Sequence, residues 1–248
     1  MVGTDKEPSN IWILSAEYNR FPEIASFNPY FREHTQKLKV SIDVDPELAA
    51  KLLEVGKEFR IALLEVCPSL SDHRCRSDSA ETEPLDPGNL GEICGRRLDD
   101  DPVDIAHLLE HMVIDLVVEI SGSDRCSGLT CGLHDPKNRF HVYVECEDAM
   151  VGEFAVRIAA KALTHLLHDV ADPAVFRRPV NLARWVVGRN GDLYTPTEIA
   201  DALGWSKNEA TDAVAELVDF GLLAEEIPPV NFSGLPYFAR GGPAPETS

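Results

Sequence analysis

The segment Asp104–Leu116 reads DIAHLLEHMVIDL and has the apolar spacing of a helix that packs against a core. Most of its residues are large and apolar, so we expect most of the helix to be buried. Three polar side chains interrupt the apolar pattern: His107, Glu110 and His111. Burying two imidazoles and a carboxylate without partners costs several kcal/mol. The segment therefore predicts a core helix that also carries a polar site.

The composition of the chain limits the kinds of function to consider. Its 248 residues, 44% of them hydrophobic, fit two domains, each with a core of its own. The net charge of -19 excludes a general attraction to nucleic acid or to an anionic membrane, and it favours a cationic or Arg-rich partner. We expect a cytoplasmic protein, because no apolar run could span a bilayer and the N-terminus lacks a signal-peptide pattern. The six cysteines have no CxxC spacing, which excludes a zinc ribbon.

The apolar periodicity predicts the fold class. We expect an α+β protein whose first domain, residues 1–172, has two layers, a sheet and a set of helices. Strands are expected at 10–15, 37–44 and 139–146, and helices at 45–67, 102–120 and 149–168. The polar stretch 68–101 is too long for a simple connector, and Cys126 and Cys131 are expected in a glycine-containing loop.

We expect a second, smaller domain at residues 173–228. We expect a flexible tail at residues 229–248. The expected order is a helix, a turn, helix 196–203, a turn at Gly204, helix 207–220 and a strand-like end. This order resembles winged-helix domains. The last helix carries four acidic residues and one lysine, whereas a helix that reads DNA needs the opposite balance. We therefore expect packing or homodimerisation rather than DNA binding.

The three polar residues of the core helix suggest a metal site. Residues four apart lie on one helical face, so His107 and His111 can both point at one ion, with Glu110 beside them. H-x-x-E-H is the reverse of the H-E-x-x-H motif, in which two histidines bind Zn²⁺ and the glutamate is the base that acts on water. The alternative is a pair of core histidines with a salt bridge to Glu110. We prefer the zinc interpretation because all three residues converge.

Four segments together resemble the N-terminal domain of cyanophycin synthetases, enzymes that polymerise aspartate and arginine. They are SNIWILS at 9–15, CPSLSDHRC at 67–75, HLLEHMVIDL at 107–116 and VYVECEDAMVGEFAVRIAAKAL at 142–163. Asp115 stands where the family often has Glu. The chain is too short for the ATP-grasp and Mur-ligase-like parts that perform synthesis, so synthetase activity is excluded. The resemblance implies the detached domain, which in some members looks like a zinc peptidase that cuts the polymer.

A catalytic zinc site of this kind needs a third protein ligand. In peptidases with the inverted motif this ligand is a glutamate from a later helix, which makes Glu153 the candidate. Glu145 and Glu147 are its rivals, and the family's carboxylate is expected one position away, at Phe154. His73 and Cys75 could support the site or line the cleft, and Arg96, Arg97 and Arg125 could bind substrate carboxylates. An ordinary loop and solvated arginines are the alternatives.

Three functions remain open. The motif favours a zinc-dependent peptidase or amidase with Glu110 as the catalytic base, acting on cyanophycin-like or Arg-rich peptides. The second is a metal-binding regulator in which the winged-helix-like domain contacts DNA or another partner. The third is a structural domain without turnover.

Overall fold

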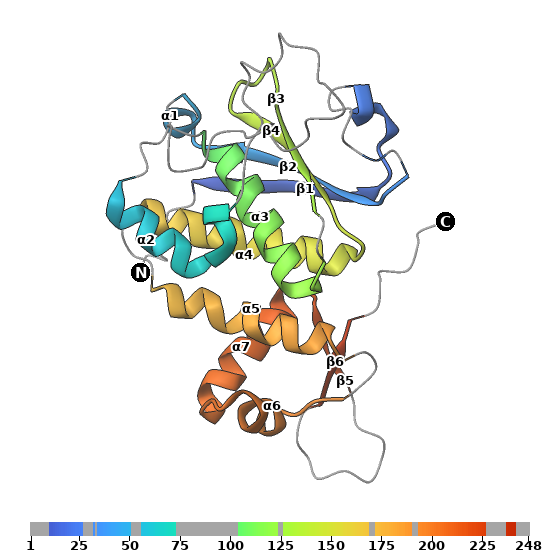
Figure 1. Ribbon diagram of the computed structural model, residues 1–248, viewed down its shortest axis with the longest axis vertical. Helices are drawn as coiled ribbons and strands as arrows, with labels where there is room; N and C mark the ends of the chain where they lie inside the picture. The colour runs from blue at the N-terminus through green and yellow to red at the C-terminus, as the bar shows by residue number, and fades with distance from the viewer. Residues whose placement is uncertain are drawn as a thin grey trace, which may run out of the picture.

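The segment quoted above forms α3 (Ile105–Ser121), which lies at the centre of the molecule (Figure 1). The Asp104 side chain caps the helix by accepting a hydrogen bond from the His107 amide, and the left-handed Gly122 (φ 68°) ends it. The helix contacts β3 and β4 as well as α4 and α5. Because other elements pack around it, even Met112 and Leu116 have no exposed surface.

The computed structural model describes residues 10–26, 32, 34–50, 56–72, 104–123, 126–168, 172–189, 193–226 and 237–241. Before α3 these contain β1 (Ile11–Asn19), η1 (Pro22–Ser26), β2 (Lys37–Val44), α1 (Pro46–Ala49), α2 (Lys57–Val66) and η2 (Pro68–Asp72). After α3 come β3 (Gly128–Gly132), β4 (Arg139–Glu145), α4 (Ala149–Leu167), α5 (Pro173–Val187), α6 (Pro196–Leu203), α7 (Lys207–Asp219), β5 (Leu223–Glu226) and β6 (Tyr237–Arg240). The predicted α+β class is confirmed.

The main sheet is antiparallel throughout, in the order β1-β2-β4-β3. In β2, alternate residues from Leu38 to Val44 are buried, as the sequence pattern predicts. The two long helices cover this side of the sheet: α4 contacts β1 and β2, and α3 contacts β4 and β3. The metal-site motif therefore faces the end of the sheet where β3 is the edge strand.

Three predicted boundaries were wrong. The segment expected as one helix at 45–67 contains two, and Gly56, which has extended backbone (φ -63°, ψ 158°), begins the second. The expected loop around Cys131 is strand β3, because pairing with β4 outweighs the poor strand propensity of its glycines. Part of the expected flexible tail is β6, which pairs with β5.

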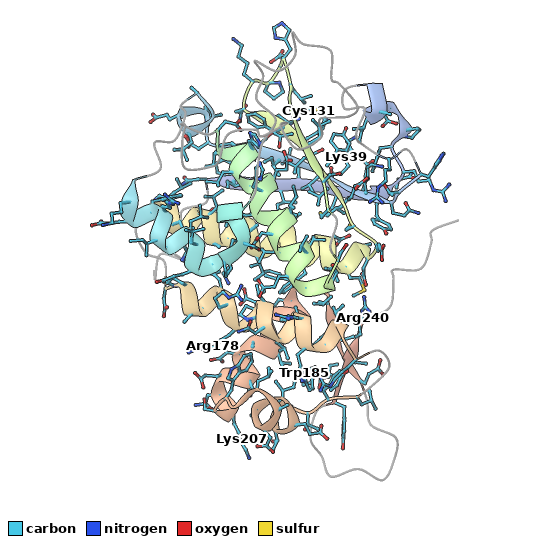
Figure 2. All side chains as sticks on the ribbon, in the orientation of Figure 1. Lys39, Cys131, Arg178, Trp185, Lys207 and Arg240 are labelled. Carbon is cyan, nitrogen blue, oxygen red and sulfur yellow. The ribbon has the colours of Figure 1, made fainter. Side chains whose placement is uncertain are left out.

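The C-terminal unit has the predicted order of a winged helix. Helices α5, α6 and α7 are followed by the β5-β6 hairpin, to which Tyr194 adds an isolated bridge with Phe238. Thr195 and Ser206 each form a capping box at the start of α6 and α7. In Figure 2, Arg178, Trp185 and Lys207 mark this unit below the sheet and its helices.

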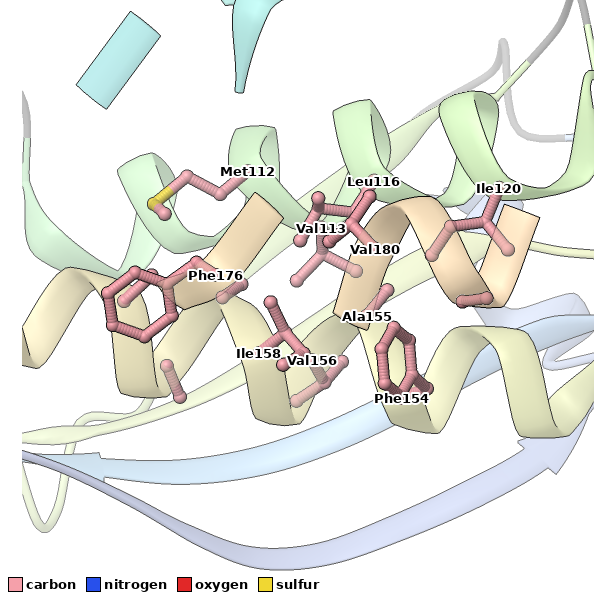
Figure 3. Packing of buried hydrophobic residues seen from close by; sticks show 14 of the residues in the cluster. Met112, Val113, Leu116, Ile120, Phe154, Ala155, Val156, Ile158, Phe176 and Val180 are labelled. Atoms are coloured by element: carbon pink, nitrogen blue, oxygen red, sulfur yellow. The ribbon is translucent and has the colours of Figure 1, made fainter. Parts of the chain in front are cut away.

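The two parts of the chain share one core instead of having two separate ones. Residues of α3, α4 and α5, among them Val113, Ile158 and Val180, belong to a single cluster of buried side chains (Figure 3). Phe154 of α4 meets Phe220, after α7, edge to face with 5.9 Å between ring centroids. The C-terminal unit therefore completes the core of the first part. Within the described residues, no helix is long and apolar enough to cross a membrane.

We predict that Phe154→Ala lowers the free energy of unfolding by about 3–5 kcal/mol, because it leaves a cavity between α4 and the C-terminal unit. Urea denaturation of the full chain measures the change. Leu14→Ala, at a position whose side chain is 47% exposed, is the control and should cost less than about 0.5 kcal/mol. Equal effects of the two substitutions would contradict the shared core.

Candidate functional site

His107 and His111 lie on successive turns of α3 with their rings side by side. Their Nε2 atoms are 3.0 Å apart, and their ring centroids are 4.8 Å apart. Two zinc–nitrogen bonds of normal length at a tetrahedral angle would separate the nitrogens by about 3.3 Å, so the pair needs little adjustment to hold one ion. A hydrogen bond from one ring to the other fits the same distance. The histidines therefore converge as predicted, and either an ion or a proton can join them.

Asp104 lies behind His107, on the side of the ring away from His111. One of its oxygens accepts the His107 backbone amide at 2.8 Å, and the other lies 3.9 Å from Nδ1 of the His107 ring. The ring contact is too long for a hydrogen bond, so the carboxylate acts on the imidazole through its charge alone. The N-cap of α3 thus places a negative charge beside the first histidine.

Glu110 points from α3 towards β3 and is 5% exposed. The Thr130 hydroxyl donates to its Oε2 at 2.5 Å. Gly128, on the same side of β3, leaves room for the carboxylate, since a Cβ built there would lie 2.5 Å from Glu110 Oε1. The strand therefore forms one wall of a close-fitting site for this carboxyl group.

The environment of Glu110 suits proton transfer. Burial raises its pKa from the ordinary 4.5 to about 7, the hydrogen bond from Thr130 opposes the shift, and the charge of Asp104 adds to it. A group with a pKa near the working pH is an effective general acid and base. The site thus pairs two facing imidazoles with a carboxyl group that can gain or lose a proton near neutral pH.

The predicted third ligand lies elsewhere in the fold. Glu153 is half-buried in the second turn of α4, and its charge contributes to the raised pKa of the Cys146 thiol. Glu145 is held by Arg32 at 3.0 Å and Thr35 at 2.7 Å, and Glu147 is exposed beyond the end of β4. Across the described ranges, no three His, Cys, Asp or Glu residues form a group that could hold a metal. The structure therefore brings together two of the three predicted ligands.

Some predicted residues lie outside the described part of the chain, namely His73, Cys75, Arg96, Arg97 and Arg125. Phe154, where the family's carboxylate was expected, is a core residue.

Sequence reasoning missed Asp104, Gly128 and Thr130. The N-cap spacing before α3 was a usable signal for Asp104. The alternation of Gly128, Thr130 and Gly132 was a weaker one, since it shows a face of small side chains only once β3 is known to be a strand.

No protein-family model matches this chain, and no curated protein matches it. The resemblance to the N-terminal domain of cyanophycin synthetases therefore stays a prediction that rests on the four segments quoted above.

We predict that Gly128→Ala destabilises the protein by about 1–3 kcal/mol, because the added methyl group overlaps the Glu110 carboxylate and the Ile114 side chain. Gly132→Ala is a matched control on the same strand, where the new Cβ would meet Phe140 at an ordinary 3.4 Å. Thermal or urea unfolding of both variants measures the difference. A larger loss at Gly132 would contradict the placement of Glu110 against β3.

We also predict a pH-dependent stability that Glu110→Gln removes. Since the pKa is raised in the folded state, the metal-free protein holds this proton more tightly when folded, and stability falls as the pH rises from about 4.5 to 7. The loss is on the order of 3 kcal/mol. Denaturation in EDTA at pH 4.5 and pH 8 should show Glu110→Gln gaining about this much relative to wild type. The exposed Glu17→Gln is the control, and an equal gain there would refute the prediction.

Proposed function

We propose that this chain is a zinc-dependent peptidase or amidase in which His107 and His111 bind the ion and Glu110 is the general base. One observation carries the proposal: two Nε2 atoms 3.0 Å apart, on the helix that also holds a buried carboxyl group whose pKa is about 7. Burial accounts for the raised pKa, and it is the convergence of the two imidazoles on the same helix that favours a metal site over ordinary core histidines.

Each residue of the candidate site has a separate role in the proposed hydrolysis. Zn²⁺, when bound, would polarise the amide carbonyl and make water more acidic. Glu110 takes a proton from the attacking water and returns it to the leaving amine nitrogen. Thr130 holds one carboxylate oxygen of Glu110, and Asp104 places its charge beside His107. Glu153, with Glu147 as its rival, stays the predicted third ligand, although neither forms a group with the two histidines within the described residues and Glu145 is engaged by Arg32 and Thr35.

Two features favour a peptide substrate, and Arg-rich or cyanophycin-like chains in particular. Strand β3 is at the edge of the sheet beside Glu110, where an extended peptide could add as a further strand. The net charge of -19 would attract arginine side chains. A cytoplasmic location also belongs to this proposal, in keeping with the free thiols of Cys67, Cys126, Cys131 and Cys146.

We infer that the winged-helix-like unit is a packing or dimer module. Lys207, Asp212 and Asp219 are exposed on α7, so its open surface carries more negative than positive charge. Glu209 and Glu216 of this helix pair with Arg178 at 2.9 Å and Lys161 at 2.6 Å, on the side that faces α5 and α4. A surface of this sign would repel the phosphates of DNA.

The proposal predicts about one zinc per chain and a selective effect of Glu110→Gln. The substitution removes the proton acceptor and keeps the side-chain size, so hydrolysis of an Arg-rich or cyanophycin-like peptide should fall at least about a hundredfold with zinc retained. His107→Ala and His111→Ala should lose the metal, and Glu153→Gln should weaken its binding if Glu153 is the third ligand. Elemental analysis and peptide hydrolysis on the same samples measure both effects.

The exposed His134 provides the control, because His134→Ala changes an imidazole elsewhere and should keep both zinc and activity. A protein that takes up no transition metal after zinc loading would refute the metal site. Activity that survives Glu110→Gln, or no activity with zinc fully bound, would remove the peptidase and favour the metal-binding regulator.

A further inference from the structure

Two thiols that the proposed chemistry does not use face each other where β3 and β4 meet. The last strand pair on this side is Gly128 with Val144, and one step further the Glu145 amide donates to the Ser127 carbonyl at 2.9 Å. The next opposed residues in the same register are Cys126 and Cys146. They therefore occupy directly opposite positions just beyond the ladder.

The side chains of these two residues lie on the same face. Both contact the large core cluster under α3 and α4, whereas Cys131 packs against the small cluster of Phe21 on the other face of the sheet. The Cys126 thiol donates to the Glu145 carbonyl at 3.0 Å, which places its sulfur beside the peptide bond that leads to Cys146. The pKa of Cys126 is raised first by burial and next by the neighbouring Cys146. The two thiols are thus close neighbours.

The position suits a covalent bond between the strands. Because Ser127 and Glu145 share a backbone hydrogen bond, the cysteine pair falls at a non-hydrogen-bonded position, where opposite Cα atoms are about 4.5 Å apart and side chains are closest. A disulfide needs a Cα separation of about 4.4–6.8 Å. The backbone therefore does not have to move far for the sulfurs to join.

We propose that Cys126 and Cys146 form a cross-strand dithiol that closes to a disulfide when a small-molecule disulfide is present. The more accessible Cys126, as its thiolate, attacks one sulfur of the reagent and releases the other as a thiolate. Cys146, after losing its proton, then attacks the Cys126 sulfur, breaks the mixed disulfide and releases the second reagent thiolate. The two thiol protons of the protein are taken up by the two released thiolates. Overall, the protein dithiol is oxidised by two electrons and the small-molecule disulfide is reduced by two.

The bond would lie next to the candidate site. Gly128 and Thr130, which contact Glu110, lie in β3, which begins two residues after Cys126. A disulfide would join this end of β3 to β4. It would also restrict the conformations of the unfolded chain between the two residues. We expect the melting temperature to rise by about 5–10 °C on oxidation and to return when a reductant is added.

The test treats the full reduced chain with excess glutathione disulfide for several hours at alkaline pH, because burial raises the pKa of both thiols and leaves little thiolate at neutral pH. Of the six cysteines in the chain, thiol titration in denaturant should find two lost, and peptide mapping should join Cys126 to Cys146. Cys146→Ser should stop at the mixed disulfide on Cys126, and Cys126→Ser should form no internal bond. Cys131→Ser, in β3 and on the opposite face of the sheet, should oxidise as the wild type does.

A second measurement keeps the test decisive if a serine variant folds poorly. Phenylarsine oxide binds two thiols only when they are close together, so the reduced wild type should bind one equivalent and protect Cys126 and Cys146 from alkylation. A disulfide that joins other cysteines, or a wild type that forms no disulfide and leaves this pair unprotected, would overturn the proposal. None of these results depends on zinc or on hydrolysis.

Discussion

The burial of the Glu110 carboxyl group against β3 is the constraint that links the core to the candidate site. A carboxyl group removed from water costs free energy unless a donor replaces the water, and here the Thr130 hydroxyl does so. Its position also requires a residue without a side chain at Gly128. The pairing of β3 with β4 fixes this arrangement, since a slip of one residue would turn Leu129 and Cys131 towards α3.

The opposite side of α3 is closed by the C-terminal unit. Arg177 of α5 reaches back to Glu119 near the end of α3 with two hydrogen bonds, at 2.7 and 2.5 Å, and also donates to the Val66 carbonyl at 3.1 Å. Apolar side chains of α5, among them Phe176 and Val180, pack between α3 and α4 (Figure 3). The helix that carries His107 and His111 is thus packed against β3 and β4 on one side and against α5 on the other. The C-terminal unit therefore contributes to the packing of the helix that carries the candidate site.

Local patterns predicted much of this structure. The spacing of apolar residues predicted strand β2 and helices α3, α4 and α5. It did so because the side chains that each element buries recur with the period of that element. The convergence of His107 and His111 is also a local property, since residues four apart on a helix are neighbours wherever the helix lies. In contrast, β3 is rich in glycine and forms a strand only because β4 supplies its partner, so its sequence resembles that of a loop.

The sequence by itself determined the fold class, the long helices and the facing pair of imidazoles, because these depend on residues close together in the chain. Only the tertiary structure decided that Glu110 meets Thr130 and Gly128, that Phe154 packs on Phe220 and that Glu153 lies near Cys146. These contacts join segments that are distant in the chain, and their geometry follows from strand register and helix packing, which no short pattern encodes. The raised pKa of Glu110 also depends on tertiary structure, since burial of its carboxyl group between α3 and β3 is the main cause.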